Sequence, residues 1–264
     1  MSLTRQQRRS ALRQALATGE QLLARGLGRT SNKAEILATA LALGTRLTAG
    51  SPGARIAAFS AALLGLYESS SRAAPTRLAL ACKKGCNWCC HNFVSASAPE
   101  ILHMAAAAGD LAPDRLARAE AAAALGPAER LGRKVACALL DVEGCARYAA
   151  RPVMCRVATS LDVASCIDEY EGRNLRSDIT VAKSPIQHGF NTRAVLFTAL
   201  AIRGLDASAY DLAGGLRESQ GGEAVAARWL AGARAFASTH TAPLDHDLAR
   251  LCEGLAVEGR ALVG

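Results

Sequence analysis

The sequence predicts a mainly α protein in which helical, bundle-like flanks surround a cysteine-rich core. Apolar side chains recur at spacings of three and four residues on both sides of the middle of the chain, as on the buried face of a helix. Eight of the nine cysteines fall between positions 82 and 166. With 264 residues, 50% of them hydrophobic, the chain is long enough to bury an ample core.

The N-terminal flank contains three predicted helices. Apolar and small side chains over residues 12–27 follow the spacing of an amphipathic helix, and two glycines end it. Asn32 followed by Glu35 has the spacing of a capping box, which opens a second helix. The apolar run 56–67 forms the face of a third helix, and it falls well short of the ~18 residues of a membrane span.

The middle of the chain contains a predicted helical hairpin. Ser97 and Glu100 have the Ser-x-x-Glu spacing of a capped helix start, and this helix runs toward residue 109. A second helix follows over residues 113–126. The hairpin separates the two halves of the cysteine set, so it must return the chain if the halves are to meet. We also expect a short pair of strands near residues 93–94 and 153.

The C-terminal flank is predicted to be helical as well. Residues 194–203 and 246–262 suit helices, and Val225, Trp229 and Phe236 repeat the three-and-four pattern between them. The chain has no internal repeat and no sustained alternation of strands and helices. The class is therefore mainly α.

The cysteines indicate metal binding. The tightest group reads Cys82-Lys-Lys-Gly-Cys86-Asn-Trp-Cys89-Cys90. Disulfide frameworks belong mostly to small secreted domains, and no apolar run follows the first arginines, so we expect no secretory signal and a soluble, cytoplasmic protein. Clustered cysteines in a reducing compartment are more often metal ligands or catalytic groups. The predicted metal ligands are Cys82, Cys86, Cys89, Cys90, Cys137, Cys145, Cys155 and Cys166.

The number and spacing of these thiols favour a polynuclear or double site. Tetrahedral zinc takes four ligands, and eight thiols suffice for two such sites. Neighbouring side chains such as Cys89 and Cys90 diverge, so they do not readily bind one mononuclear centre together. The Cys82-x3-Cys86-x2-Cys89 spacing also occurs in radical S-adenosylmethionine enzymes, but those need a barrel of alternating strands and helices. A radical S-adenosylmethionine enzyme therefore stays a lower-ranked alternative for the function of this chain.

The second half of the cysteine set carries a longer pattern. Cys137 is followed by Cys145-Ala-Arg-Tyr-Ala-Ala-Arg-Pro-Val-Met-Cys155-Arg. Together with the first group, this order resembles the YkgJ-type cysteine-cluster family of zinc- or iron-chelating domains. The matching positions outside the thiols are Tyr148, Arg151, Pro152 and Arg156, whereas Ala138 and Arg147 depart from the pattern, and Cys166 lies outside it. The resemblance covers roughly residues 80–170.

The resemblance implies metal binding by these cysteines. A relative of that family, flagellin lysine N-methylase, carries an iron–sulfur cluster, so we place an iron–sulfur cluster (4Fe-4S) ahead of Zn²⁺. Pro152 fixes the backbone shortly before Cys155. Arg151 and Arg156 either tune the cluster by offsetting thiolate charge or form salt bridges with Asp141, Glu143 or Asp162. For Tyr148 we expect packing rather than catalysis.

Two breaks isolate the middle of the chain. A linker is predicted over residues 69–76, and residues 183–189 close the far side. The predicted organisation is an N-terminal helical region over 1–77, a cysteine-cluster metal-binding domain over 78–185 and a C-terminal helical region over 186–264.

Charge and the remaining residues narrow the function classes. The first 81 residues carry 11 Lys and Arg against 3 Asp and Glu, which matches the whole net charge of +8. With 4% aromatic residues, the chain lacks a base-stacking platform, so we expect no nucleic-acid partner. We expect none of the five histidines to bind the metal, and Cys252 to be a buried core thiol.

Three classes of function remain open: a redox or methyl-transfer enzyme, a zinc-stabilised interaction module with a protein partner, and a metal-handling protein. No acid, base or nucleophile stands out in the sequence, so whether the chain is an enzyme stays undecided. We expect that a pocket beside the metal would favour the enzyme, and that complete coordination by the protein's own thiols would favour the module.

Overall fold

The protein is mainly helical, as the sequence predicts. A computed structural model describes residues 4–72, 79–83, 85–173, 179 and 181–264. Its α-helices are α1 Arg5–Arg25, α2 Lys33–Gly44, α3 Pro52–Arg72, α4 Ala98–Ala108, α5 Pro113–Ala123, α6 Pro127–Gly132, α7 Val153–Val157, α8 Val163–Glu171, α9 Lys183–Ile202, α10 Leu212–Glu218, α11 Glu223–Leu230 and α12 His246–Val263. Short 3-10 turns are η1 Thr45–Leu47, η2 Trp88–His91 and η3 Tyr148–Ala150.

The few strands form two small antiparallel sheets. They are β1 Ser95–Ser97, β2 Leu140–Asp141, β3 Gly144–Cys145, β4 Ala209–Asp211 and β5 Thr241–Ala242. One sheet has the order β1-β4-β5, and the other is the β2-β3 hairpin. The first sheet therefore joins the segment after the first cysteine group to the C-terminal part of the chain.

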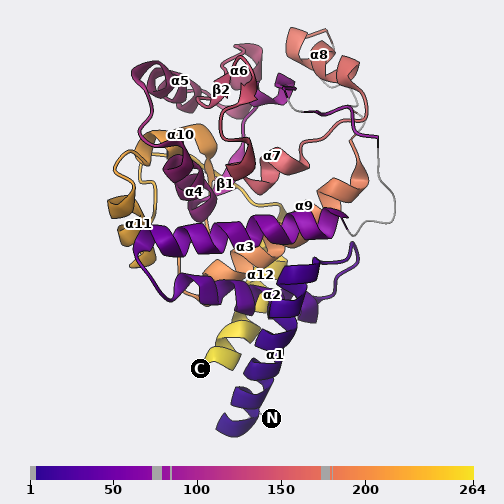
Figure 1. The fold of residues 1–264 in the computed structure, drawn as a ribbon, viewed down its shortest axis with the longest axis vertical. Helices are drawn as coiled ribbons and strands as arrows, with labels where there is room; N and C mark the ends of the chain where they lie inside the picture. The colour runs from indigo at the N-terminus through magenta and orange to yellow at the C-terminus, as the bar shows by residue number, and fades with distance from the viewer. Residues whose placement is uncertain (1–3, 73–78, 84, 174–178, 180) are drawn as a thin grey trace.

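Helix α3 lies across the middle of the molecule and separates two layers (Figure 1). On one side, α1, α2 and α12 pack with the later part of α9, whose start lies beyond α3 against α7, and the N-terminal half of α1 projects beyond this group. The other side carries α4 to α8 with the cysteine segments. Helices α1 and α2 approach so closely at Gly19 that a Cβ atom there would collide with the carbonyl of Ala38. None of the helices in the described ranges is both long enough and apolar enough to cross a bilayer.

The large buried aromatic side chains lie outside the cysteine region. Phe59, Phe197, Tyr210, Trp229 and Phe236 are each at most 2% exposed. One continuous apolar cluster contains residues of all three predicted regions. The cysteine region contributes mainly aliphatic side chains to this cluster. The division of the chain into three regions stays a prediction.

Both predicted capping boxes are confirmed. The Asn32 side chain accepts a hydrogen bond from the backbone N–H of Glu35, whose carboxylate accepts from the N–H of Asn32. At the start of α4, the Glu100 carboxylate accepts from both the backbone N–H and the hydroxyl of Ser97. These reciprocal bonds satisfy N–H groups that a helix start otherwise leaves without partners.

The predicted helices 12–27, 56–67, 194–203 and 246–262 correspond to α1, α3, α9 and α12. The helix predicted over 113–126 ends at Ala123, and α6 follows it without having been predicted. The pattern that reaches Phe236 is helical only to Leu230; Phe236 is nevertheless fully buried.

Three further expectations about local structure are wrong. Residues 69–72 continue α3 rather than starting a linker, and residues 73–76 lie outside the described residues. Residues 183–189 form the start of α9, because a proline in the first turn needs no hydrogen-bonded N–H. The predicted strand pair is replaced by β1 paired with β4, and Val153 begins α7.

Candidate metal centre

The first cysteine group lies on a loop that turns back on itself. Gly85 has φ +89°, which is favourable only for glycine and lets the chain bend between Cys82 and Cys86. The backbone N–H of Cys86 donates to the carbonyl of Lys83 at 3.0 Å. Cys89 and Cys90 lie on the η2 turn.

The second group meets the first through backbone contacts. The N–H of Cys137 donates to the carbonyl of Cys90 at 2.8 Å. The β2-β3 hairpin then brings Cys145 opposite Leu140. Gly144 in this hairpin approaches the first loop so closely that a Cβ atom would lie 3.3 Å from the Cα of Gly85. The helical hairpin α4-α5 therefore returns the chain, as the sequence analysis requires.

Cys155 is held in place by a carboxylate of the capping box. Glu100 is 5% exposed, and one of its oxygens accepts from Ser97 at the start of α4. Its other oxygen accepts the N–H of Val153 at 2.8 Å. This second contact satisfies the first N–H of α7, the short helix that carries Cys155. One buried side chain thus connects the starts of two helices.

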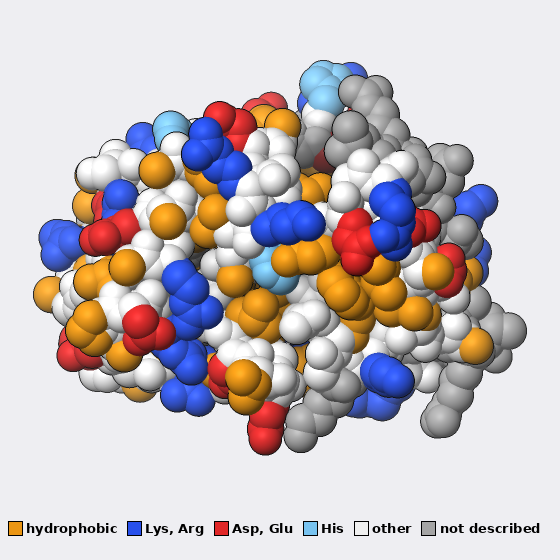
Figure 2. All heavy atoms as spheres, turned by 90° about the horizontal axis from the view of Figure 1, so that it is seen from above, with side chains coloured by type: hydrophobic (Ala, Val, Ile, Leu, Met, Phe, Trp, Pro, Cys, Tyr) orange, Lys and Arg blue, Asp and Glu red, His pale blue; other side chains and the backbone are white. Residues whose placement is uncertain are grey.

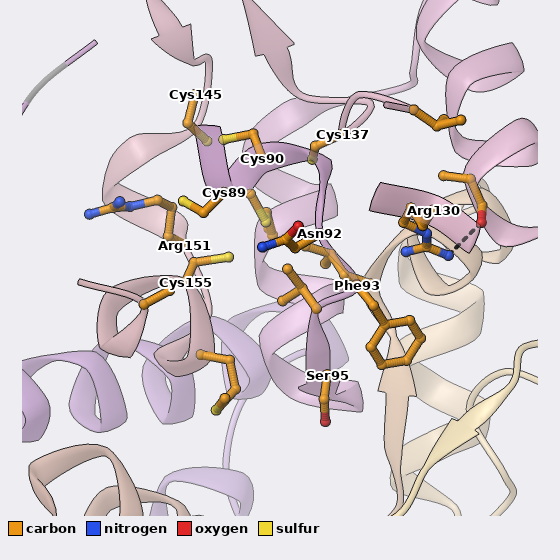
Figure 3. A pocket seen from close by; sticks show the side chains of 18 of the residues that line it. Cys89, Cys90, Asn92, Phe93, Ser95, Arg130, Cys137, Cys145, Arg151 and Cys155 are labelled. Atoms are coloured by element: carbon orange, nitrogen blue, oxygen red, sulfur yellow. Dashed lines mark hydrogen bonds between the residues drawn. The ribbon is translucent and has the colours of Figure 1, made fainter. Parts of the chain in front are cut away.

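Thiols from these segments surround a common cavity of about 350 Å³. Its cysteine lining is Cys86, Cys89, Cys90, Cys137, Cys145 and Cys155. Figure 3 shows the side chains of Cys89, Cys90, Cys145 and Cys155 turned toward one space, with Cys137 beside it. Among the described residues, no three Cys, His, Asp or Glu side chains stand close enough together to coordinate a single ion as drawn. The thiols therefore line a space rather than converge on one point.

The other two predicted ligands lie apart from the cavity lining. The Sγ of Cys82 accepts the N–H of Ser160 at 3.2 Å. The thiol of Cys166, on α8, donates to the carbonyl of Asp162 at 3.7 Å. The pKa of Cys166 is raised first by burial and then by the charges of Cys82 and two cavity cysteines, Cys86 and Cys89. We call Cys82 and Cys166 the outer thiols.

Burial and neighbouring thiols determine the charge of the cavity. Burial raises the pKa of the Cys137 and Cys155 thiols, which favours their neutral forms. The Cys90 thiol donates a hydrogen bond to Cys89, which lowers the pKa of Cys89 and raises that of Cys90. A metal cation reverses this preference, because a coordinating thiol is deprotonated. The donor set therefore fits a thiolate-bound metal or cluster.

The two arginines of the cysteine pattern have different surroundings. Arg151 lines the cavity, and its guanidinium stacks 3.4 Å from the ring centroid of Tyr148. Burial raises the pKa of the Cys145 thiol, and the charge of Arg151 opposes this shift. Arg156 instead forms an ion pair with Glu68 at 2.8 Å, a partner outside the predicted set. Arg151 is therefore the arginine placed to offset thiolate charge.

Three residues for which the sequence predicts no role in metal binding or catalysis are Cys252, His91 and Tyr148. Cys252 is buried on α12, where its thiol donates to the carbonyl of Ala194, as expected. His91 is buried, and the centroid of its ring lies 4.7 Å from the ring centroid of Tyr170. Tyr148 is 47% exposed and lines the mouth of the cavity.

Several residues of the cavity lining other than cysteines were not predicted from the sequence. Asn92 and Arg130 both line it, and Figure 3 shows Asn92 beside the thiols and Arg130 farther away. Arg130 lies on α6, whose six residues are too few to give a periodic signal. The face of the molecule that carries this region is seen in Figure 2, where apolar side chains gather near the centre with Lys and Arg around them.

Comparison with known proteins supports a cysteine-cluster domain. Residues 81–176 match the family model CxxCxxCC, described as "putative zinc- or iron-chelating domain". This agrees with the resemblance found in the sequence and confirms a metal-binding cysteine region over these residues. The comparisons with curated proteins and with solved structures gave no significant match.

Proposed function

We propose that this chain is a metal-binding cysteine-cluster protein that carries an iron–sulfur cluster of the 4Fe-4S type. The observation that supports it most is that six cysteines, from four segments of the cysteine region, line one cavity. A polynuclear centre suits thiols that surround a space, whereas one zinc ion needs four ligands at about 2.3 Å from a single point. An iron–sulfur cluster supplies electron transfer or an open metal position.

The eight predicted ligands divide naturally into two sets under this proposal. Cys90, Cys137, Cys145 and Cys155 hold the cluster in the cavity. Cys82, Cys86, Cys89 and Cys166 bind a second metal on the outer side. Cys86 and Cys89 lie between the sets, because both line the cavity and both influence the outer thiol of Cys166. The adjacent residues Cys89 and Cys90 then serve different centres, which their diverging side chains permit.

The residues around the cavity have supporting roles in this proposal. Arg151 offsets the negative charge of the thiolates from the cavity wall, and Arg156 fixes its loop by donating from Nε to the carbonyl of Arg151 at 2.9 Å. Glu100 holds the start of the helix that carries Cys155. The cytoplasm suits a chain with so many reduced thiols.

The second candidate function is an interaction module stabilised by a fully coordinated zinc ion, and the shape of the cavity disfavours it. In a structural zinc site the protein fills every coordination position, whereas here the thiol-lined space continues along an apolar wall that includes Phe93 and Leu212. This arrangement favours a centre with access for another molecule, including a redox or methyl-transfer reaction. Rapid metal loss to a mild chelator would instead support a metal-handling role.

Anaerobic purification tests the proposal. We expect a brown protein with iron, acid-labile sulfide and visible absorption, and loss of these signals in Cys155→Ser. Cys252→Ser is the matched control, since Cys252 is buried but remote, and it should retain them. Under the two-set proposal, Cys166→Ser should lose one metal and keep the visible spectrum. A colourless protein with stoichiometric zinc would reject the iron–sulfur assignment.

A further inference from the structure

Helix α8, which carries the outer thiol of Cys166, is loosely attached to the rest of the protein. None of its 9 residues is fully buried, whereas each other α-helix in the described ranges has at least one buried residue. It packs against the η2 turn, and Figure 1 shows it at the edge of the molecule. Elements with so little buried surface open most easily, so α8 can move without disturbing the core.

Hydrogen bonds connect the turn before α8 to both outer thiols. The backbone N–H of Ser160 donates to the Sγ of Cys82 at 3.2 Å. Two residues later, the carbonyl of Asp162 accepts from the thiol of Cys166 at 3.7 Å. The Ser160 hydroxyl also donates to the carbonyl of Asp162 at 2.7 Å. One tight turn therefore holds Cys82 and Cys166 at the same end of α8.

An aromatic contact attaches the other end of α8. The ring centroid of Tyr170 lies 5.2 Å from that of Trp88 and 4.7 Å from that of His91. Both of these partners lie on η2. The Nζ of Lys134 lies 4.6 Å from the centroid of the Tyr170 ring. The Tyr170 ring thus fixes the C-terminal end of α8 against η2 through contacts that involve no metal ligand.

The same face of α8 carries Cys166 and Tyr170, because residues four positions apart are neighbours on a helix surface. The η2 turn that Tyr170 contacts also carries Cys89, so Cys166 lies on the side of α8 that faces the first cysteine group. No three Cys, His, Asp or Glu side chains in the described ranges are close enough to coordinate one ion, so the sulfurs must move together before they bind a metal. Of the two helical elements that carry them, η2 is restrained by the buried His91, whereas α8 has no buried residue.

We propose that α8 is a movable cover over an exchangeable metal site formed by the outer thiols with Cys86 and Cys89. When the Tyr170 contact opens, a thiophilic divalent cation such as Zn²⁺ reaches these cysteines, and when α8 closes, Cys166 completes a four-thiolate site. This inference rests on the proposed division of the eight cysteines into two sets. It adds that the outer metal exchanges while the cavity centre is retained, since that centre is held by segments other than α8.

Zinc release to an excess of a chromogenic chelator tests the cover. The protein is purified under anaerobic conditions, loaded with Zn²⁺ and mixed with the chelator, while its visible absorption is followed on the same sample. Tyr170→Ala removes two ring contacts, each of which stabilises the closed position by a factor of roughly two to twelve, so zinc release should become about tenfold faster. Tyr170→Phe is the matched control, because it keeps the ring, and it should release zinc at the wild-type rate. The visible absorption should persist in all three proteins.

The outcomes separate this inference from the iron–sulfur proposal. Equal zinc release from wild type and Tyr170→Ala would overturn the cover, and so would loss of the visible absorption at the same rate as zinc. Failure of the iron-loaded protein to bind zinc would overturn it as well. A colourless protein would instead reject the iron–sulfur assignment, and its zinc release would still test the role of α8.

Hydrogen exchange over residues 163–171 gives a second readout that does not depend on release. Zinc should raise the protection of the α8 amides at least about tenfold in the wild type, because a bound metal holds the helix closed. In Cys166→Ser, zinc should leave this protection unchanged, since α8 then has no ligand to offer. Unchanged protection of α8 on zinc binding to the wild type would show that the helix does not close over the metal, and the inference would fail.

Discussion

Breaking the buried ion pair between Arg130 and Asp211 should cost a large part of the folding stability. It joins α6, next to the cysteine cavity, to β4 in the C-terminal part of the chain. Asp211→Ala leaves a guanidinium that is 4% exposed without its carboxylate, and breaking such a pair costs roughly 3–5 kcal/mol. Asp211 also caps α10 by accepting from Ala213 and Gly214, which adds about 1 kcal/mol. The expected loss is therefore about 4–6 kcal/mol.

The measurement is chemical denaturation of the metal-loaded protein under anaerobic conditions. The free energies of unfolding are compared with the same dependence on denaturant concentration (m-value) for all variants. Glu20→Ala is the matched control. Glu20 pairs with Arg46 at 2.6 Å, close to the 2.7 Å of the buried pair, but these side chains are 45% and 36% exposed. Exposed pairs contribute roughly 0–1 kcal/mol. The two variants therefore differ in the burial of the pair and in the α10 cap that Asp211 also provides.

The partner variant gives a second, sharper expectation. Arg130→Met leaves the Asp211 carboxylate buried, but that carboxylate keeps two backbone N–H donors at the start of α10. Arg130→Met should therefore lower the free energy of unfolding by less than Asp211→Ala does. Losses below about 1 kcal/mol in Asp211→Ala, or the reverse order of the two variants, would refute the reasoning.

Three other predictions concern metal, pH and helix packing. Metal removal or Cys155→Ser should lower hydrogen-exchange protection over residues 80–170 while the flanking helices largely keep theirs, because metal-binding free energy becomes folding free energy; equal protection in both forms would contradict this. The pKa of Asp206 is lowered: burial alone would raise it, but hydrogen bonds to the carboxylate outweigh burial. Its stabilisation is therefore complete above pH 3.8 and is lost as the pH falls below that value, so Asp206→Asn should show a weaker loss of stability in acid titration. Gly19→Ala should lower the unfolding free energy by about 1–3 kcal/mol, since its Cβ meets a backbone carbonyl of α2. Gly65→Ala, with no atom within 4 Å, should instead raise it, and similar values for both glycines would show that the helix contact is looser.

Local signals in the sequence were sufficient for most helices. The capping boxes at Asn32 and Ser97 depend on side chains three residues apart, so their geometry is set within one turn. The errors arose where distant contacts decide the conformation. Residues 69–71 are three serines, yet Ser70 is buried, and its hydroxyl accepts the backbone N–H of Leu27, 43 residues earlier in the chain.

The order and spacing of the cysteines determined by themselves that this protein has a metal-binding region, because thiol chemistry depends on residue type. Which thiols share a cavity was decided only by the tertiary structure. Cys137 meets Cys90 through a hairpin of more than forty residues. The placement of Arg130 likewise depends on Asp211, a partner 81 residues away. No local pattern encodes such distant pairs, since burial and charge pairing are established only when the helices pack.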